Sequence, residues 1–261
     1  MQSPFLSIII PAYNEEVRLP LTLQRTAAFL RQQPYRAEVL VVENGSTDQT
    51  SFVVQQFMRD NVWPDDPFQI HLLHSAKGKG AAVKQGMLTA KGEYLIMSDA
   101  DLAVPIEDVN DFVPPKLPAH SFDVAIASRE LSGAKRNGEP GYRHLMGRVF
   151  NLLVRVMAVP GVQDTQCGFK CFTREAARLV FPLQRIDGWG FDVEILHIAA
   201  HQHLHMLEVP VNWFYGQNSR IRPIESTISM VKELLLIRAN SQQGYYDKQR
   251  TAPVIDKLPV T

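Results

Sequence analysis

The fold follows from the stretch Tyr94-Leu95-Ile96-Met97-Ser98-Asp99-Ala100-Asp101, in which an apolar run breaks abruptly into two carboxylates. If the run is a β-strand, its two-residue period places the side chains of Asp99 and Asp101 on one face at the strand end. Two carboxylates in that position suit a divalent cation, which prefers oxygen ligands. We therefore expect the chain to handle phosphates through a metal.

Short β-rich runs alternate with helical patterns on the N-terminal side of this stretch. The apolar runs are continuous, as expected for parallel strands buried on both faces. The predicted strands are 6–10, 38–42, 70–74 and 94–98, and the predicted helices are 19–32, 50–60 and 80–90. This alternation indicates an α/β fold with a mostly parallel central sheet flanked by helices.

Turn-forming residues follow these strands at 11–14, 44–46 and 98–99, so polar groups should collect at the carboxyl edge of the sheet, where open sheets bind ligands. The pattern is looser after Pro105. There we expect strands at 124–128 and 206–213, a loop at 132–143, and helices at 145–159, 175–180, 193–200 and 224–238.

Composition favours one large domain. The chain has 261 residues, 45% of them hydrophobic, and 27 basic residues balance 27 acidic ones, which argues against nucleic acid as a partner. We expect neither an export signal nor a run of about 18 apolar residues that would span a membrane. The two cysteines, Cys167 and Cys171, suit neither a disulfide framework nor a zinc cage, so we expect a cytoplasmic protein that is soluble or peripheral to a membrane.

The turn after the first strand offers groups for a nucleotide. Tyr13 can stack on a base, and Glu15 can accept hydrogen bonds from ribose or base. The alternative is a plain turn in which Asn14 caps the next helix. Glu43, at the end of the second strand, is a further candidate acceptor.

The segment Lys77-Gly78-Lys79-Gly80 opens the third predicted helix, although it is not a Walker A loop. Two ammonium groups, flexible backbone and a helix N-terminus would meet there, where a diphosphate can lie. Alternatively, the glycines cap a surface turn and the lysines are solvated. Asp99 and Asp101 have a similar alternative, a simple Asx turn.

Basic residues cluster locally in the second half of the chain. Guanidinium groups match a phosphate monoester in bidentate fashion, although a solvated loop has the same composition. The basic residues are Arg129, Lys135, Arg136, Arg143 and Arg148.

Two helical segments, 149–159 and 224–237, carry apolar stripes with basic margins. Interfacial helices have this pattern, and core helices share it. Cys167 is expected to be structural. His197 and His201 have helical spacing but lack the glutamate of a metalloprotease motif, so we do not expect a metal there.

Six segments together resemble, in order and spacing, the family 2 glycosyltransferases of the GT-A fold, and within them the dolichyl-phosphate or polyprenyl-phosphate β-glucosyltransferases. The resemblance runs from Ser7 to about Arg238. The matching segments are 7–16, 43–48, 77–80, 99–103, 164–170 and 188–194. One departure is Glu43-Asn44, where the family more often has paired aspartates.

The resemblance implies a GT-A domain over residues 1–240, with a nucleotide-sugar half at 1–105, an acceptor half at 106–240 that ends in acceptor-side helices, and a flexible tail at 241–261. It implies that Asp101, helped by Asp99, holds Mg²⁺ or Mn²⁺. The implied catalytic residues are Asp99, Asp101, Asp164 and Asp192; the nucleotide sugar is bound by Pro11, Tyr13, Glu15, Glu43, Lys77, Lys79 and Asp99; the acceptor is bound by Arg129, Arg143, Arg148, Gln166, Trp189, Arg220 and Arg222.

The implied reaction moves glucose from UDP-glucose to dolichyl or polyprenyl phosphate, with inversion, in protein glycosylation. A phosphate monoester is largely dianionic at pH 7, so a general base is optional, and Asp164, Asp192 and Glu194 would orient groups instead. The alternatives are a mannosyltransferase that uses GDP-mannose, transfer to a non-lipid acceptor, and a sugar-nucleotide-binding protein without turnover. The usual eukaryotic relative has an N-terminal span that this chain is expected to lack, so surface contact or a partner would bring it to the membrane.

Overall fold

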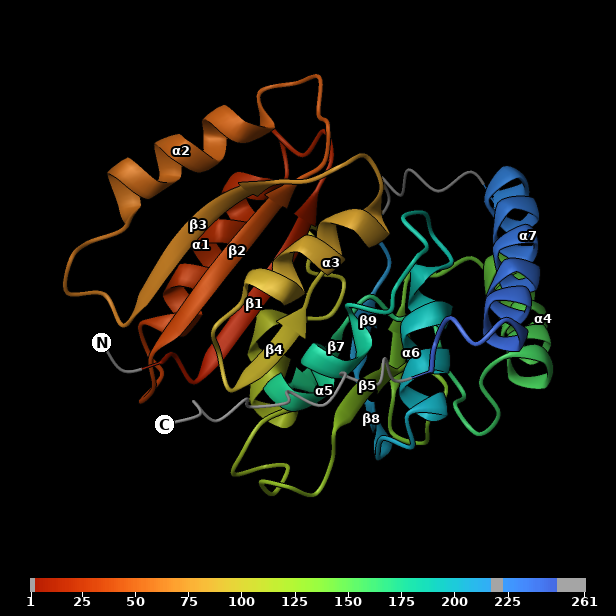
Figure 1. Ribbon diagram of the computed structural model, residues 1–261. Coiled ribbons are helices and arrows are strands. Elements are labelled where there is room, and N and C mark those ends of the chain that lie inside the picture. The colour runs from red at the N-terminus through yellow and green to blue at the C-terminus, as the bar shows by residue number, and fades with distance from the viewer. Residues whose placement is uncertain (1–2, 217–222, 248–261) are drawn as a thin grey trace, which may run out of the picture.

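The computed structural model describes residues 3–216 and 223–247, which form a seven-stranded sheet with helices on both faces (Figure 1). The strand order is β3-β2-β1-β4-β7-β5-β8, and a second sheet pairs β6 with β9. The strands are β1 (Leu6–Ala12), β2 (Ala37–Glu43), β3 (Phe68–His74), β4 (Tyr94–Met97), β5 (Val124–Ser128), β6 (Lys135–Asn137), β7 (Lys170–Thr173), β8 (Met206–Pro210) and β9 (Asn212–Phe214). The helices are α1 (Leu19–Leu30), α2 (Thr50–Asn61), α3 (Lys79–Thr89), the 3₁₀ helix η1 (Ile106–Asp111), α4 (Gly141–Met157), α5 (Arg174–Val180), α6 (Phe191–His201) and α7 (Pro223–Gln242).

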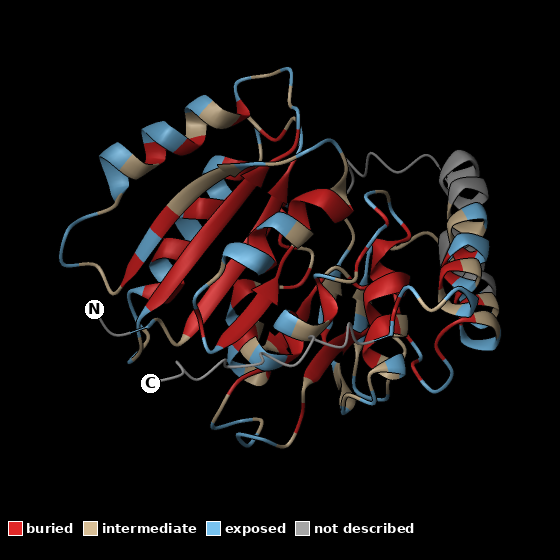
Figure 2. Cartoon of the chain, viewed as in Figure 1, coloured by how far each residue is buried: buried red, intermediate tan, exposed pale blue. Residues whose placement is uncertain are grey.

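The predicted parallel sheet is confirmed. Strands β1, β2, β3 and β4 pair in parallel, and every residue of β1, β2 and β4 is buried (Figure 2). Ile8 and Ile10 pack with Leu19 of α1, whereas Ile9 packs with Val83 of α3. The continuous apolar runs therefore reflect a sheet covered on both faces, as parallel sheets require.

This topology brings together the predicted site segments at the ends of β1, β2 and β4. β1 lies between β2 and β4, and Ala12 is in register with Glu43. The N–H of Ser98 donates to the carbonyl of Ile9 at 2.9 Å, which carries the β4 end alongside β1. The order reverses between β1 and β4, and such a switch point opens a crevice at the carboxyl ends of the strands.

The second half differs from the prediction in its strands. β7 was not predicted; it is only four residues long, begins with the charged Lys170, and runs antiparallel between β4 and β5. The predicted strand 206–213 is two strands, because β8 ends at Pro210, which has no N–H to donate, and the chain then pairs through β9 with β6. β6 lies inside the segment predicted as loop.

One helix boundary also differs. Helix α4 begins at Gly141, four residues before its predicted start at 145. Tyr246, which follows the expected domain end at residue 240, is fully buried, and its hydroxyl donates to Glu194 at 2.7 Å. Within residues 3–216 and 223–247, no helix combines the length and the apolar character needed to cross a bilayer.

Candidate active site

Lys79 and Asp99 meet at the carboxyl edge of the sheet. Lys79 is the first residue of α3, and its Nζ lies 2.6 Å from Oδ1 of Asp99 at the end of β4. Gly78 precedes it with φ +128, and a Cβ there would lie 2.2 Å from the carbonyl oxygen of Asp187, so only glycine fits. The close turn thus directs the first side chain of the helix towards Asp99.

Aromatic rings and carboxylates surround the Lys79 ammonium. Its Nζ lies 5.6 Å from the ring centroid of Trp189 and 5.9 Å from that of Phe191. Burial alone would lower the pKa of Lys79, but the charges of Asp99, Asp192 and Asp101 outweigh it and raise this pKa. Lys79 is therefore a permanent cation beside the two aspartates.

Asp101 lies beside Asp99 and accepts a hydrogen bond from the N–H of Ala103 at 3.1 Å. Partial removal of its carboxylate from water, followed by the negative charge of Asp99, raises the pKa of Asp101. A divalent cation would relieve this repulsion. Among the described residues there is no group of three or more His, Cys, Asp or Glu side chains that could hold a metal, so the protein would offer two carboxylates. Mg²⁺ is bound in this manner when substrate phosphates supply further oxygens, and the donor set fits.

Arg18 is a site residue that the sequence reasoning missed. It precedes α1 and makes a bidentate pair with Glu15, with Nε 2.6 Å from Oε2. The pKa of Arg18 is raised first by this hydrogen bond and also by the charges of Asp101 and Asp99, which places the guanidinium near the two aspartates. Glu15, predicted to accept from ribose or base, is engaged with Arg18. The sequence signal that could have identified Arg18 was its charge directly before Leu19-Pro20, where a helix begins.

Segment 164–170 reaches Asp99 because β7 is antiparallel to β4, which brings the start of β7 to the carboxyl edge. A Cβ on Gly168 would lie 2.0 Å from Oδ2 of Asp99. The Asp99 carboxylate thus lies directly against Gly168. This contact explains why position 168 is a glycine, which the sequence motif alone did not explain.

Asp164 and Arg129 form a buried bidentate pair. Arg129 donates from Nε to Oδ2 at 2.7 Å, from a terminal nitrogen to Oδ1 at 2.9 Å, and from its backbone N–H to Oδ2 at 3.0 Å. Burial would raise the pKa of Asp164, but Arg129 lowers it to about 2. The guanidinium also lies 5.2 Å from the ring centroid of Trp213. The predicted catalytic carboxylate and the predicted acceptor arginine are therefore bound to each other.

Asp192 is paired in the same way. The fully buried Lys170 donates from Nζ to Oδ1 of Asp192 at 2.5 Å and to the carbonyl of Cys167 at 2.7 Å. This pair joins β7 to the first turn of α6, whose Phe191 ring faces Lys79 and whose Asp192 charge acts on it.

Glu43 ends β2 and is held by its surroundings. It accepts from the backbone N–H of Ser46, and its Oε2 lies 3.0 Å from Nδ1 of His74. Burial acts to raise the pKa of Glu43, but these hydrogen bonds bring it below its usual value. Asn44 donates to the carbonyl of Ala12 at 3.0 Å and so ties the ends of β1 and β2 together.

Tyr13 and Lys77 also meet, with Nζ of Lys77 5.8 Å from the tyrosine ring centroid. Pro11 is buried within β1. Helix α1 has no side-chain cap, and Asn14 instead accepts from the N–H of Thr47 at 2.7 Å, so the capping alternative for Asn14 is wrong.

The predicted acceptor residues are described in part. Gln166 donates to Sδ of Met230 on α7 at 3.0 Å, and Arg148 is exposed on α4. The side chain of Arg143 and the whole of Arg220 and Arg222 lie outside the described residues. Gly216, which precedes that segment, lies against Asp101, since a Cβ on it would be 3.6 Å from Oδ2.

Cysteine and histidine chemistry finds no support in the described chain. Both cysteines are buried, and burial raises the pKa of Cys167 to about 12, so its thiolate is not available as a nucleophile. His197 contacts the carbonyl of Ala158 through Nδ1, and His201 contacts Asp247 through Nε2, each at 2.8 Å.

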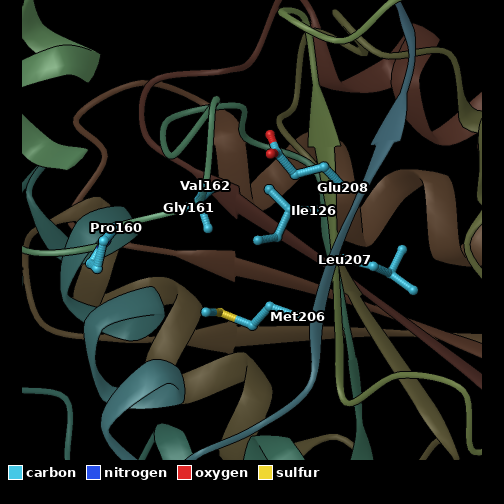
Figure 3. Close-up of a pocket in the computed structure, with 7 residues that line it drawn as sticks. All are labelled: Ile126, Pro160, Gly161, Val162, Met206, Leu207 and Glu208. Carbon is cyan, nitrogen blue, oxygen red and sulfur yellow. The ribbon is translucent and has the colours of Figure 1, made fainter.

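A pocket of about 310 Å³ lies elsewhere, at the β8 edge of the sheet (Figure 3). Glu208, which lines it, accepts from the N–H groups of Gln163 and Asp164. The pocket holds none of the predicted site residues; its lining is Ile126, Pro160, Gly161, Val162, Met206, Leu207 and Glu208.

Comparisons with known proteins show the family of the chain. A family profile described as "Glycosyl transferase family 2" matches residues 7–181. Dolichyl-phosphate beta-glucosyltransferases are similar to the chain: that of Homo sapiens is 35% identical (94% of this chain, 78% of the relative), and that of Saccharomyces cerevisiae is 32% identical (93% and 76%).

Solved structures share the fold at low sequence identity. Glucosyl-3-phosphoglycerate synthase from Mycobacterium tuberculosis, in complex with Mn²⁺, UDP-glucose and phosphoglyceric acid, superposes with a TM-score of 0.64 at 17% identity, covering 92% of this chain and 80% of that one. The same enzyme with Mg²⁺ and UDP has a TM-score of 0.62 at 18% identity, with 92% and 80% covered. This likeness identifies a GT-A architecture. Because the family profile matches more than half of the chain and curated relatives are more than 30% identical over most of their length, the chain belongs to glycosyl transferase family 2 and is a glycosyltransferase.

Proposed function

We propose that the chain transfers glucose from UDP-glucose to dolichyl or polyprenyl phosphate in a metal-dependent, inverting reaction. The observation that carries this proposal is the convergence of Asp99, Asp101 and Lys79 at the switch point between β1 and β4. The glucosyl donor and the lipid phosphate acceptor follow the names of the curated relatives.

The side chains at this switch point would have different roles in the reaction. Asp101 and Asp99 would hold Mg²⁺ or Mn²⁺, which when bound neutralises charge on the departing nucleoside diphosphate. Lys79 would stabilise the same charge, and its ion pair orients Asp99. Arg18, fixed by Glu15, adds a further cation near the aspartates.

The base and ribose would lie over the ends of β1 and β2, against Pro11, Tyr13, Glu43 and Lys77. A dianionic phosphate monoester attacks without losing a proton, so no side chain is required as a general base. The contacts of Asp164 and Asp192 support this proposal, because each carboxylate is paired with a cation inside the protein, Arg129 or Lys170. We propose that both orient the acceptor side of the site.

The acceptor phosphate would be met by Arg143, Arg148, Arg220 and Arg222, with Gln166 and Trp189 beside it. Helices α4 and α7 pack together at one side of the molecule (Figure 1) and expose apolar side chains. The exposed apolar residues are Leu152 and Val156 on α4 and Leu235 and Leu236 on α7. We propose that this helix pair rests on the cytoplasmic face of a membrane that carries the acceptor.

The test is a panel of radiolabelled UDP-glucose and GDP-mannose, each with and without a short polyprenyl phosphate, in Mn²⁺ and in excess EDTA. We expect organic-phase product only with UDP-glucose, polyprenyl phosphate and metal together. Product from GDP-mannose would favour the mannosyl alternative, release of free sugar without lipid product would favour another acceptor, and full activity in EDTA would contradict the role of Asp101. An α-linked product from the α-linked donor would contradict inversion.

A further inference from the structure

Glu233, on α7, occupies a notch between two glycines of the segment that carries Trp189. Its Oε2 accepts the backbone N–H of Gly190 at 2.7 Å. A Cβ on Gly188 would lie 2.2 Å from Oε1, and one on Gly190 would lie 2.7 Å from Oε2. The carboxylate therefore fits only because positions 188 and 190 have no side chain.

The contact is at the N-terminus of α6. Gly190 is the residue that precedes the helix, and no side chain of its own caps it. Glu233 thus satisfies a backbone donor that the helix leaves without a partner, and its negative charge lies at the positive end of the helix dipole. Among the described residues no lysine or arginine forms an ion pair with Glu233, so its interaction is with the 188–190 backbone.

The same face of α7 contacts a second predicted acceptor segment. Met230, three residues before Glu233, accepts from Nε2 of Gln166. Residues three apart lie on one face of a helix, so one face of α7 contacts both Gln166 and the backbone that carries Trp189. α7 begins at Pro223, directly after the segment that contains Arg220 and Arg222.

Trp189 links this contact to the metal-side residues. Its ring faces Nζ of Lys79 at 5.6 Å, and that Nζ is 2.6 Å from Asp99. Trp189 is exposed and lies between the two glycines that Glu233 holds. Movement of the 188–190 backbone would displace the ring from Lys79 while the Lys79–Asp99 pair stays in place.

We propose that Glu233 is a positioning residue for acceptor transfer, which fixes the Gly188–Gly190 backbone and so holds Trp189 over Lys79. This proposal rests on the proposed function for its kinetic part only; the geometric part, the place of Trp189, is independent of it.

The geometric part is tested by fluorescence in a background where Trp189 is the sole tryptophan, made with Trp63→Phe and Trp213→Phe. In this background Glu233→Ala should shift the emission of Trp189 and increase its quenching by acrylamide. Glu233→Gln should preserve the spectrum of the single-tryptophan parent, because the amide oxygen still accepts from Gly190. Glu107→Ala, at an exposed position of η1, is the matched control. An unchanged Trp189 spectrum in Glu233→Ala would overturn the proposal.

Gly188→Ala provides an independent route to the same contact. The new methyl group would displace the flexible Glu233 carboxylate and break its bond to Gly190. Because both changes remove one interaction, the double variant with Glu233→Ala should show no larger spectral change than the stronger single variant. Additive changes would mean that Gly188 and Glu233 act separately, against the proposal.

The kinetic part uses the full-length enzyme with its native tryptophans. In Glu233→Ala, kcat/KM for polyprenyl phosphate should fall about tenfold, within the range for a lost hydrogen bond to a charged group, while the KM for UDP-glucose stays within about twofold. Glu233→Gln should recover most of the loss. Equal losses of kcat/KM for both substrates would indicate a merely structural role for Glu233 and would contradict the proposal. If wild-type enzyme makes no lipid product at all, the proposed function fails, and the fluorescence result still decides the place of Trp189.

Discussion

Asp99 and Asp101 lie two residues apart, yet their surroundings differ. Asp99 has a cation, Lys79, at 2.6 Å and a glycine, Gly168, beneath its carboxylate. Asp101 has a backbone N–H on one oxygen, and burial, followed by the nearby charge of Asp99, raises its pKa. Asp101 is therefore the carboxylate whose charge is least compensated by the protein itself, and a cation should depend on it most.

Asp101→Asn should lower glucosyl transfer by at least about 100-fold, because the amide keeps the shape and removes the charge that would hold a cation. Thermal stability should not fall, since the change removes repulsion with Asp99. The measurement is initial rate against Mn²⁺ concentration, with the exposed Asp65→Asn as control. A variant with wild-type rate and wild-type Mn²⁺ dependence would contradict this role.

Gly168→Ala should disrupt the same site through the position that lies against the Asp99 carboxylate. The new Cβ would lie 2.0 Å from Oδ2 of Asp99, so the carboxylate must move away from Lys79. We expect activity to fall about tenfold or more, as for other sites where a reacting group is misplaced by about 1 Å. Gly141→Ala, where a Cβ meets no atom within 4 Å, should keep full activity in the same assay.

At the scale of elements, buried ion pairs join the second half of the sheet to the site. Arg129 follows β5 and Asp164 precedes β7, and their pair fixes the two segments next to each other. Lys170 and Asp192 join β7 to α6. Removing one partner of such a pair leaves a charge in a low-dielectric setting, which costs more than the pair contributes.

Asp164→Asn should therefore reduce the free energy of unfolding by about 3 kcal/mol, because Arg129 would remain buried without a counter-charge. Urea denaturation measures this. The surface pair Lys116–Asp111, at 3.7 Å, is the matched control, and Asp111→Asn should change stability by less than about 1 kcal/mol. Equal effects of the two substitutions would show that burial of the Asp164 pair has no energetic consequence.

The same pair gives a pH dependence with a defined sign. The pKa of Asp164 is about 2 in the folded protein, below its ordinary value of 3.8, so its contribution is present above pH 4 and is lost as the pH falls towards 2. The loss should be about 2 kcal/mol, from about 1.4 kcal/mol per pKa unit. The free energy of unfolding of wild type should fall more steeply than that of Asp164→Asn between pH 4 and pH 2; parallel curves would contradict the lowered pKa.

The Tyr246 hydroxyl is one of several contacts that hold the C-terminal segment to α6. Tyr246 donates to Glu194 and also accepts from Asn240 at 3.2 Å, and the Glu194 carboxylate in turn accepts the N–H of Ile186 at 2.8 Å. Tyr246→Phe should lower the free energy of unfolding by about 1–3 kcal/mol, because Glu194 loses a partner inside the protein. Tyr245→Phe, on the exposed neighbour, should have little effect in the same denaturant titration.

At the scale of the whole molecule, helices α4 and α7 lie to one side of the sheet whose carboxyl edge carries the candidate site (Figure 1). Val156 and Leu152 are exposed on α4, and Leu235 and Leu236 on α7. Exposed apolar residues on two packed helices, together with the exposed Arg148 and Arg155 of α4, are the pattern of a helix pair on a lipid surface.

Binding to vesicles that contain anionic lipid should therefore weaken when Leu152 and Val156 are both replaced by Glu, while activity on a water-soluble short-chain acceptor is retained. Flotation of the protein with vesicles is the measurement. The exposed Phe52 on α2, replaced by Glu, is the control on a distant element, and it should leave flotation unchanged. Loss of flotation in the control alone would place the membrane contact elsewhere.

Local patterns were sufficient for the first half of the fold. The runs of β1, β2 and β4 are mostly apolar because both faces of the sheet are covered, and this pattern is visible in the sequence. The second half was less predictable, because β7 pairs antiparallel with strands distant in the chain and contains a buried lysine. Its partner Asp192 lies 22 residues away, and no local period reveals such a pair.

The amino-acid sequence by itself determined the α/β class, the family, and the segments that gather at the carboxyl edge, because strand periodicity and turn chemistry are local. Only the tertiary structure decided which charges meet. It joins Asp164 to Arg129, Asp192 to Lys170 and Lys79 to Asp99. The reason is physical: a charge is neutralised by whatever folds next to it, and long-range strand pairing, which no local pattern encodes, sets those neighbours.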